Sequence, residues 1–289
     1  MMNSNTFDFK RFGSYIASDA RNCVANFGLS AILISCAGVI TYLAVTLFNL
    51  IFNGEWMSSG QALRLFVFCM AMIVMVTSMP VKCYGRLTEK KAGSSWLMIP
   101  ASRTEKFTSM VILNCIAIPL VMATAYLLLD LIICTIDPSC GKSLIFGLRE
   151  LWFTVMETSI DSGDISVMLP DMEKFVHQVG NPLLYMDDTI MLMLIFLLGA
   201  IVFKKAKTSK TILAFIIIST ILGMLCLPLV RVFFEGFTNN IHTMDATQLN
   251  ELFKTWPFHH IALLDTISDT IVNILLLTCI YHRIKTLKH

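Results

Sequence analysis

Long uncharged apolar runs dominate the pattern of this chain, and short charged segments separate them. An α-helix rises about 1.5 Å per residue, so about 20 apolar residues cross the roughly 30 Å hydrocarbon core of a bilayer. The fourth predicted span, residues 189–203, is the shortest. Asp188 and Lys204 at its ends are therefore expected at the membrane interface, unless the bilayer is thinner there. Pro119 predicts a kink inside the third predicted span, residues 107–134. The six predicted spans are residues 27–52, 65–81, 107–134, 189–203, 211–230 and 263–282.

The segment ahead of span 1 has a mixed pattern. Residues 7–24 place Phe9, Phe12, Ile16 and Val24 among charged side chains. This amphipathic spacing predicts a separate helix that lies on the cytoplasmic membrane surface.

Composition excludes an ordinary soluble domain. A chain of 289 residues with 56% hydrophobic residues, 15% charged residues and a mean hydropathy of +0.71 has more apolar surface than one soluble core can hide. The formal net charge is only +2, and no nucleic-acid partner is expected.

The distribution of charge predicts how the chain is oriented. Cytoplasmic loops of membrane proteins are rich in Lys and Arg, so the basic segments and both termini are expected on the cytoplasmic side of a bacterial cytoplasmic (inner) membrane. The acidic residues between spans 3 and 4 then lie outside. The basic segments are residues 10–21, 82–106, 204–210 and 283–288. The predicted organisation is an N-terminal half at residues 1–135, an outer segment at 136–186 and a C-terminal half at 187–289.

The nine cysteines include no C-x-x-C pair, which argues against metal or thioredoxin-type chemistry. Cys134 and Cys140 fall on the predicted outer side, where either a disulfide or two free thiols fit the sequence. His259 and His260 could join nearby carboxylates around a metal ion, but their aromatic surroundings favour a membrane interface, and no metal site is expected.

No nucleotide-binding or catalytic motif is present. Gly141-Lys142-Ser143 resembles the end of a phosphate-binding loop, but Ile136 stands where the first glycine of that motif is required. The chain is therefore not expected to be an enzyme or to hold a cofactor of its own.

The loop between spans 2 and 3 is the most informative stretch. Leu97, Met98 and Ile99 form a short apolar surface in an otherwise basic loop, followed by Pro100. Such a surface suits a protein partner, although it could instead dip into the lipid headgroups. A second feature follows at once. Ser102 and Glu105 have the spacing of a capping box that starts the helix of span 3, with Arg103 between them.

The run Leu97-Met98-Ile99-Pro100-Ala101-Ser102-Arg103-Thr104-Glu105-Lys106 resembles the "LLPxSRxE" segment between spans 2 and 3 of permease subunits in type-2 export-class ABC transporters. The resemblance implies an all-α polytopic membrane protein with six transmembrane helices and a cytoplasmic N-terminal elbow helix. The long outer segment between spans 3 and 4 departs from the commoner pattern of that family.

The resemblance also implies partners. The loop would dock on a separate cytoplasmic ATP-binding subunit, which would hold ATP and magnesium, and the contact residues would be Leu97, Met98, Ile99, Pro100, Ser102, Arg103 and Glu105. A second permease copy or a paralogue would complete the membrane pathway, surrounded by lipid.

Ionisable residues inside span 6 are a second candidate site. A span of sufficient length that ends at His282 must include Asp265 and Asp269, which lie four residues apart on one helical face with Asn273. This stripe is expected to face the interior of the bundle, because a charge in hydrocarbon costs several kcal/mol. Asp265 could instead mark the outer interface of a tilted helix. Asp130 and Arg231 are the expected partners of the stripe.

Two functional hypotheses follow. The favoured one is a permease subunit of an ATP-driven transporter, an exporter, that forms the pathway and couples to the ATPase. The alternative is an intramembrane enzyme that uses Asp265 and Asp269, or a membrane scaffold that transports nothing.

Overall fold

The protein is described by a computed structural model that covers residues 7–54, 56, 58, 60–89, 93, 96, 98–147, 186–241 and 258–286; side chains are not described for 186–187, 226, 229–241 and 258–266. Within these ranges every regular element is helical and no strand occurs. The prediction of an all-α chain is confirmed for this part of the protein.

The first helical stretch corrects the expected division into a surface helix and span 1. Helix α1 (Phe9–Ser35) runs without a break through the predicted junction, and α2 (Ala37–Asn53) follows after a single bend at Cys36. The Asp8 side chain accepts a hydrogen bond from the backbone N–H of Lys10 and begins α1. Gly54, with φ of 70°, ends α2 in the left-handed conformation that glycine adopts without strain. Residues 7–24 are therefore the first part of one long helix.

Helix α3 (Gln61–Tyr84) corresponds to span 2 and is followed by a short 3₁₀ turn, η1 (Gly85–Thr88). Span 3 comprises α5 (Arg103–Ile112), a π-helical turn, η2 (Leu113–Ala117), and α6 (Ile118–Ile136). Proline lacks a backbone N–H and its ring clashes with the carbonyl four residues earlier. The widened turn directly before Pro119 accommodates both effects and is the form that the predicted kink takes.

Span 4 is a central helix in the structure. Helix α9 (Met186–Val202) packs against α3, α10 and α12. Leu194, Leu197, Ala200 and Ile201 on this helix are at most 1% exposed. A helix that is apolar on all sides is typically a buried one, as these side chains are.

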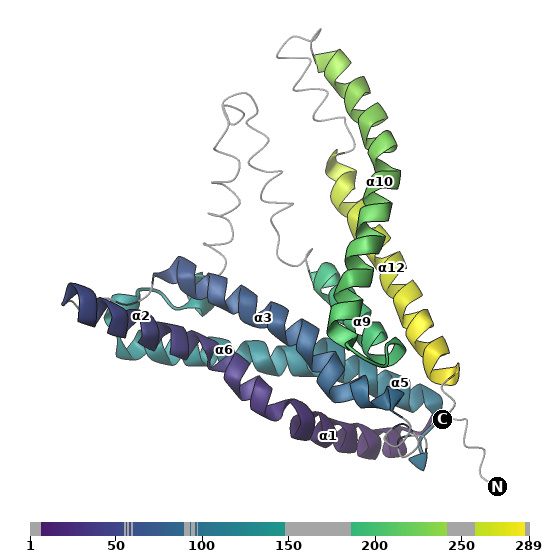
Figure 1. The fold of residues 1–289 in the computed structure, drawn as a ribbon, viewed down its shortest axis with the longest axis horizontal. Helices are drawn as coiled ribbons and strands as arrows, with labels where there is room; N and C mark the ends of the chain where they lie inside the picture. Colours follow the sequence, from purple (N-terminus) through teal and green to yellow (C-terminus); the bar gives the residue numbers. More distant parts are fainter. Residues whose placement is uncertain are drawn as a thin grey trace.

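Two longer helices flank α9. Helix α10 (Lys207–Ile241) corresponds to span 5, and α12 (Phe258–Thr286) corresponds to span 6 and contains Asp265, Asp269 and Asn273 in one continuous helix. Figure 1 shows α1, α2, α3 and α6 running together as one group, while α10 and α12 rise from it steeply. The two groups are joined where α9 meets α3.

The buried core has three parts along the first group. Cys23, Tyr84, Met110 and Ile280 belong to the part where α1, α3, α5, α9 and α12 meet. A methionine-rich part lies next to it, and a small outer part contains Ala71, Tyr126 and Leu144. Leu144 follows directly on the turns after α6, so the outer segment of the chain begins packed against α3 and α6.

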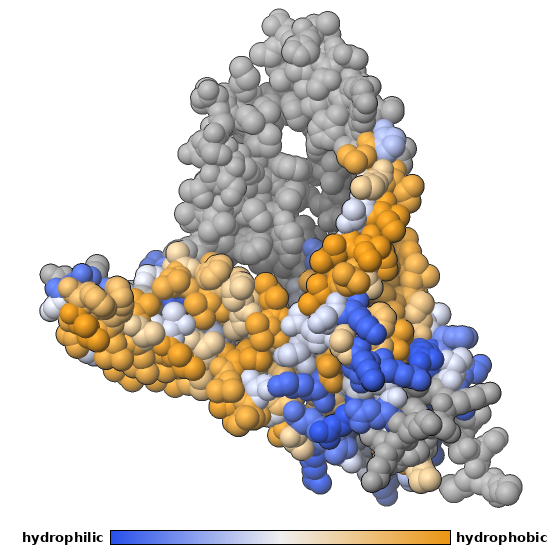
Figure 2. Space-filling view, viewed as in Figure 1, coloured by the Kyte–Doolittle hydropathy of each residue, from blue (hydrophilic) through white to orange (hydrophobic). Residues whose placement is uncertain are grey.

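Most apolar side chains outside this core are exposed on long helices. Five helical stretches are long and apolar enough to cross a membrane: Phe9–Asn53, Gln61–Thr88, Arg103–Ile136, Lys207–Leu225 and Ile267–Thr286; Asp188–Val202 is shorter. Figure 2 shows the resulting hydrophobic surface over the first group of helices and over α10 and α12. These surfaces indicate a membrane-embedded protein, because water does not solvate apolar faces of this size favourably. Six crossings remain a prediction.

Candidate functional site

The basic segments of the chain come together at one end of the structure. Hydrophilic surface gathers there in Figure 2, around the start of α1, the start of α5 and the connection between α9 and α10. Three contacts join these segments: Arg11 with Glu105, Lys207 with the carbonyl of Gly85, and the ring of Phe107 with that of Tyr281, 5.5 Å away. The charge pattern predicted that these segments share a side, and the structure places them at a common end, here called the basic end.

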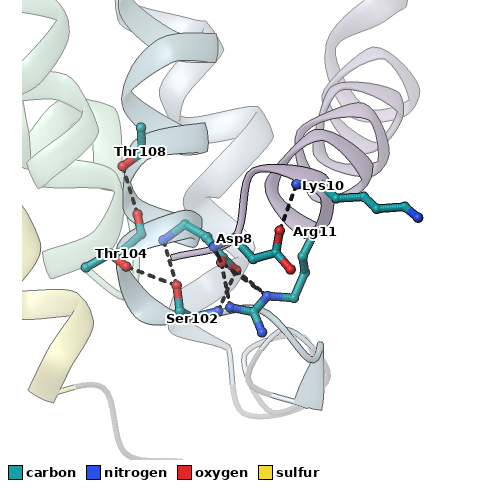
Figure 3. Close-up of polar contacts among 7 residues, drawn as sticks. Asp8, Lys10, Arg11, Ser102, Thr104 and Thr108 are labelled. Atoms are coloured by element: carbon teal, nitrogen blue, oxygen red, sulfur yellow. Dashed lines mark hydrogen bonds and ion pairs between the residues drawn. The ribbon is translucent and has the colours of Figure 1, made fainter. Parts of the chain in front are cut away.

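Polar contacts gather around Asp8, Arg11 and Ser102 at the basic end (Figure 3). The acceptor that they share is Glu105. Its carboxylate is completely buried and accepts from Arg11 at 2.6 Å from Nη2 and, in a forked contact, at 2.9 and 3.1 Å from Nε. The backbone N–H groups of Asp8 and Ser102 donate to the same carboxylate at 2.9 and 2.8 Å. Charge-assisted bonds of this kind are the strong class, so the start of α1 is fixed to the start of α5.

The predicted capping box is present. The Ser102 hydroxyl accepts from the backbone N–H of Glu105 at 3.2 Å, while the Glu105 side chain accepts from the backbone N–H of Ser102. Thr104 adds a 3.0 Å contact between its hydroxyl and that of Ser102. The helix of span 3 therefore begins where the sequence predicted, and the same residues that begin it hold α1.

A second set of contacts folds the loop back onto α1. The indole N–H of Trp96 donates to the Tyr15 hydroxyl at 3.0 Å. Lys106 donates to the carbonyl of Trp96 at 2.8 Å and lies 4.8 Å from the centroid of its ring. A cation over an indole face is favourable, and here it joins the loop to the first turn of α5.

These anchors divide the predicted ATPase-contact residues into two classes. Met98 is 82% exposed, and Ile99, Pro100 and Arg103 are exposed beside it. Ser102 and Glu105 are only 4% and 0% exposed. The expectation that Ser102 and Glu105 touch a partner directly is therefore corrected: their polar atoms are used within the chain, and their role is to position the loop. Leu97 lies outside the described residues.

A buried carboxylate that the sequence analysis did not single out lies near this surface. Asp19 on α1 accepts from the Ser109 hydroxyl at 2.8 Å and from the Tyr84 hydroxyl at 3.2 Å. It joins α1, α3 and α5 with neutral donors. The signal that could have found it is an acidic residue inside the amphipathic segment at residues 7–24.

At the opposite end Asp130 has a different partner from the expected one. Arg64 Nη1 lies 2.8 Å from Asp130, and the two side chains are only 2% and 5% exposed. Arg64 also donates to the carbonyls of Cys140 and Lys142 at 2.7 and 3.0 Å. The backbone N–H of Leu144 donates to Asp130 at 2.7 Å. Asp130 thus fixes the turn after α6. Its partnership with the stripe on α12 stays a prediction, since the side chains of residues 258–266 lie outside the described residues.

The two cysteines at this end are free thiols in the structure, the second of the two alternatives left open by the sequence. Arg64 Nη1 lies 2.6 Å from Cys134 Sγ, while Cys140 is buried. Close by, Asp137 accepts from the Tyr42 hydroxyl at 2.7 Å, from the Trp56 indole at 3.1 Å and from the backbone of Ser139 at 2.9 Å. The bonds from Ser139 and Tyr42 lower the pKa of Asp137 below its ordinary value.

The stripe predicted on α12 is described in part. Asp269 is half-buried, and Asn273, also half-buried, has a buried Oδ1 that meets no hydrogen-bond donor among the described residues. The side chains of Asp265 and Arg231, and those of His259 and His260, lie outside the described residues. Among the described residues, no group of three or more His, Cys, Asp or Glu side chains lies close enough together to hold a metal ion.

Comparison of the chain with protein-family models, with curated proteins and with solved structures finds no match. The resemblance to ABC permeases consequently depends on residues 97–106 and on the order of apolar segments.

Proposed function

We propose that this chain is the permease subunit of an ATP-driven exporter of the ABC type, and that the exposed surface formed by Met98, Ile99, Pro100 and Arg103 is its contact with a cytoplasmic ATP-binding subunit. The observation that carries the proposal is the geometry of this surface. Apolar side chains and one cation are exposed beside a helix start that Glu105 and Arg11 fix to α1. A contact surface must be accessible, and it transmits force only if its support is rigid.

The support extends into the apolar helices. Residues 98–103 lead directly into α5, whose first turn is bound to α1 through Glu105 and to the loop through Lys106. A displacement of the surface would therefore move α1 and α5 together. ATP and magnesium would be held by the partner, and a second permease copy or a paralogue would complete the pathway, with Asp265, Asp269 and Asn273 as candidates for its lining.

The test is purification of the full chain from its native host in mild detergent, followed by identification of co-purifying P-loop proteins and measurement of ATP hydrolysis. We expect the double variant Met98→Asp/Arg103→Glu to lose both the P-loop subunit and the hydrolysis. The matched control is Arg21→Glu, which reverses an exposed cation on α1. Retention of the subunit by the double variant would exclude this surface, and the absence of any P-loop subunit from the wild-type preparation would exclude the ABC assignment.

Orientation is tested separately. If the basic end is cytoplasmic, a reporter fused after His289 is active only in the cytoplasm, whereas one inserted near Asp164 reports an external location. The reverse pattern would invert the orientation argued from charge.

A further inference from the structure

Four lysines lie at the tip of the helical hairpin formed by α9 and α10. Lys204 and Lys205 precede the reversal of the chain, and Lys207 and Lys210 follow it. Ala206, at φ of 49°, occupies the left-handed region, and its carbonyl accepts from the N–H of Lys210 at 3.0 Å. The reversal is therefore sharp, and it leaves Lys204, Lys205 and Lys210 exposed.

A second chain segment adds to this cluster. Lys207 Nζ donates to the carbonyl of Gly85, which brings η1 beside the hairpin tip. The next residue, Arg86, is exposed. Glu89 is the acidic side chain nearest in sequence on this segment, so the cluster keeps a clear excess of positive charge. We call Arg86, Lys204, Lys205 and Lys210 the hairpin-tip patch.

The position of the patch relative to the apolar helices indicates its partner. No Lys, Arg, Asp or Glu occurs between Asp188 and Lys204, or between Lys210 and Arg231. Both arms of the hairpin are thus free of charge up to the tip, and the lysines stand where the apolar length ends. In a membrane-embedded helix that depth is the headgroup layer, which lysine reaches with its long aliphatic stem.

We propose that the hairpin-tip patch binds the phosphate groups of anionic phospholipids and thereby fixes the position of the short helix α9 in the membrane. Cationic side chains gathered from two segments provide the charge complementarity, and each adds to the attraction of an anionic lipid surface. The uncharged run at residues 189–203 is shorter than the roughly 20 residues that cross a bilayer core, so an anchor at its basic end sets its depth in the membrane. The inference rests on membrane embedding alone and not on the proposed transport function.

The test uses the full chain in neutral detergent, titrated with phosphatidylglycerol and, separately, with phosphatidylcholine, with bound lipid counted by native mass spectrometry. We expect preferential binding of phosphatidylglycerol. The variant Lys204→Gln/Lys205→Gln should raise the half-saturating mole fraction of phosphatidylglycerol about fivefold for each lysine removed. The variant Lys204→Arg/Lys205→Arg keeps the charge and should bind as the wild type does. Lys142→Gln, at the opposite end and also exposed, is the matched control and should leave binding unchanged.

Thermal unfolding without added lipid establishes that each variant is folded. Equal binding of the two lipids by the wild type, or unchanged phosphatidylglycerol binding in Lys204→Gln/Lys205→Gln, would overturn the proposal. Displacement of the lipid by millimolar inorganic phosphate would assign the patch to a small anion. Loss of a co-purifying protein with lipid binding unchanged would assign it to an acidic protein surface. Because no ATPase is present in the titration, none of these results depends on the transport hypothesis.

Discussion

Arg64 and Asp130 form a buried ion pair, with 2.8 Å between Nη1 and Oδ1, although they are 66 residues apart in the sequence. Arg64 lies in the first turn of α3, and Asp130 lies in the last two turns of α6. Arg64 Nη2 donates to the carbonyls of Cys140 and Lys142 in the turn that follows α6, and Asp130 Oδ2 accepts from the backbone N–H of Leu144. The pair therefore closes one end of the first helix group.

Removing one member of this pair should be costly, because it leaves the other charge buried. We expect Arg64→Met to lower the free energy of unfolding by about 3–5 kcal/mol. The double variant Arg64→Met/Asp130→Leu replaces both charges by apolar side chains and should recover most of that loss. Denaturant titration in detergent measures both. If the double variant is as unstable as the single one, the ion pair stabilises the folded protein by more than the burial of its two charges costs.

The contact between Arg11 and Glu105 should appear as a coupling energy. We expect Arg11→Gln and Glu105→Gln to destabilise the protein and the double variant to fall short of the sum by about 1–3 kcal/mol, because either change alone breaks the same charge-assisted bonds. Thermal or denaturant unfolding supplies the four values. Lys10→Gln, an exposed neighbour on α1, is the control. Additive effects would mean that the ion pair does not fix α1 to α5.

A single methyl group, added by a Gly→Ala substitution, tests how closely α9 and α10 pack. A Cβ at Gly199 would lie 1.9 Å from Oγ1, 2.7 Å from Cγ2 and 2.8 Å from Cβ of Thr211, so the helices must separate to accept it. We expect Gly199→Ala to destabilise the protein by about 1–3 kcal/mol. Gly223→Ala is the matched control, since nothing lies within 4 Å of that position. If the two variants unfold alike, the hairpin is looser than the structure describes.

Asp137 should give the protein an acid-sensitive component of stability. Its pKa is lowered by bonds from Ser139 and Tyr42, so its stabilising contribution is complete above the unfolded-state pKa of about 3.9. That contribution is lost as the pH falls below this value toward the lowered pKa of the folded state. We expect Asp137→Asn to flatten the fall of the thermal midpoint between about pH 4 and the lowest accessible pH. Glu89→Gln, a change at an exposed carboxylate, should leave the profile as it is.

A further prediction concerns the stripe of Asp265, Asp269 and Asn273 on α12, and it rests on the proposed transport function. Asp269 is half-buried, and Asp265 lies one turn nearer the start of the helix. Replacement by Asn removes the charge and keeps most of the size and hydrogen-bonding capacity. We expect Asp269→Asn to reduce transport, or partner-stimulated ATP hydrolysis, more than Asp265→Asn does. Normal activity of both variants, or a cysteine at position 269 that reacts only with lipid-soluble reagents, would show that the stripe is not part of a hydrated pathway.

Much of the helical framework was predictable, because the information for it is local. Each of the six uncharged runs falls in a helical stretch, apart from the bend at Cys36 and the last residue of the fourth. Pro119 marked the π-helical turn, and Ser102 with Glu105 marked the start of α5. The expected break near residue 25 was wrong, since amphipathic and fully apolar helical patterns can follow each other in one helix without any backbone signal. The number of membrane crossings and the transport function stay predictions.

The sequence by itself determined which segments are apolar helices and which segments carry the positive charge, because propensity, capping and hydropathy act over a few neighbouring residues. Only the tertiary structure decided which side chains meet. It paired Arg64 with Asp130, turned Glu105 inward to Arg11, and made the short α9 a central helix. Such contacts depend on how helices are rotated and shifted against one another. That packing is set by complementary shape and by the need to pair buried charges across many residues, and no local pattern specifies it.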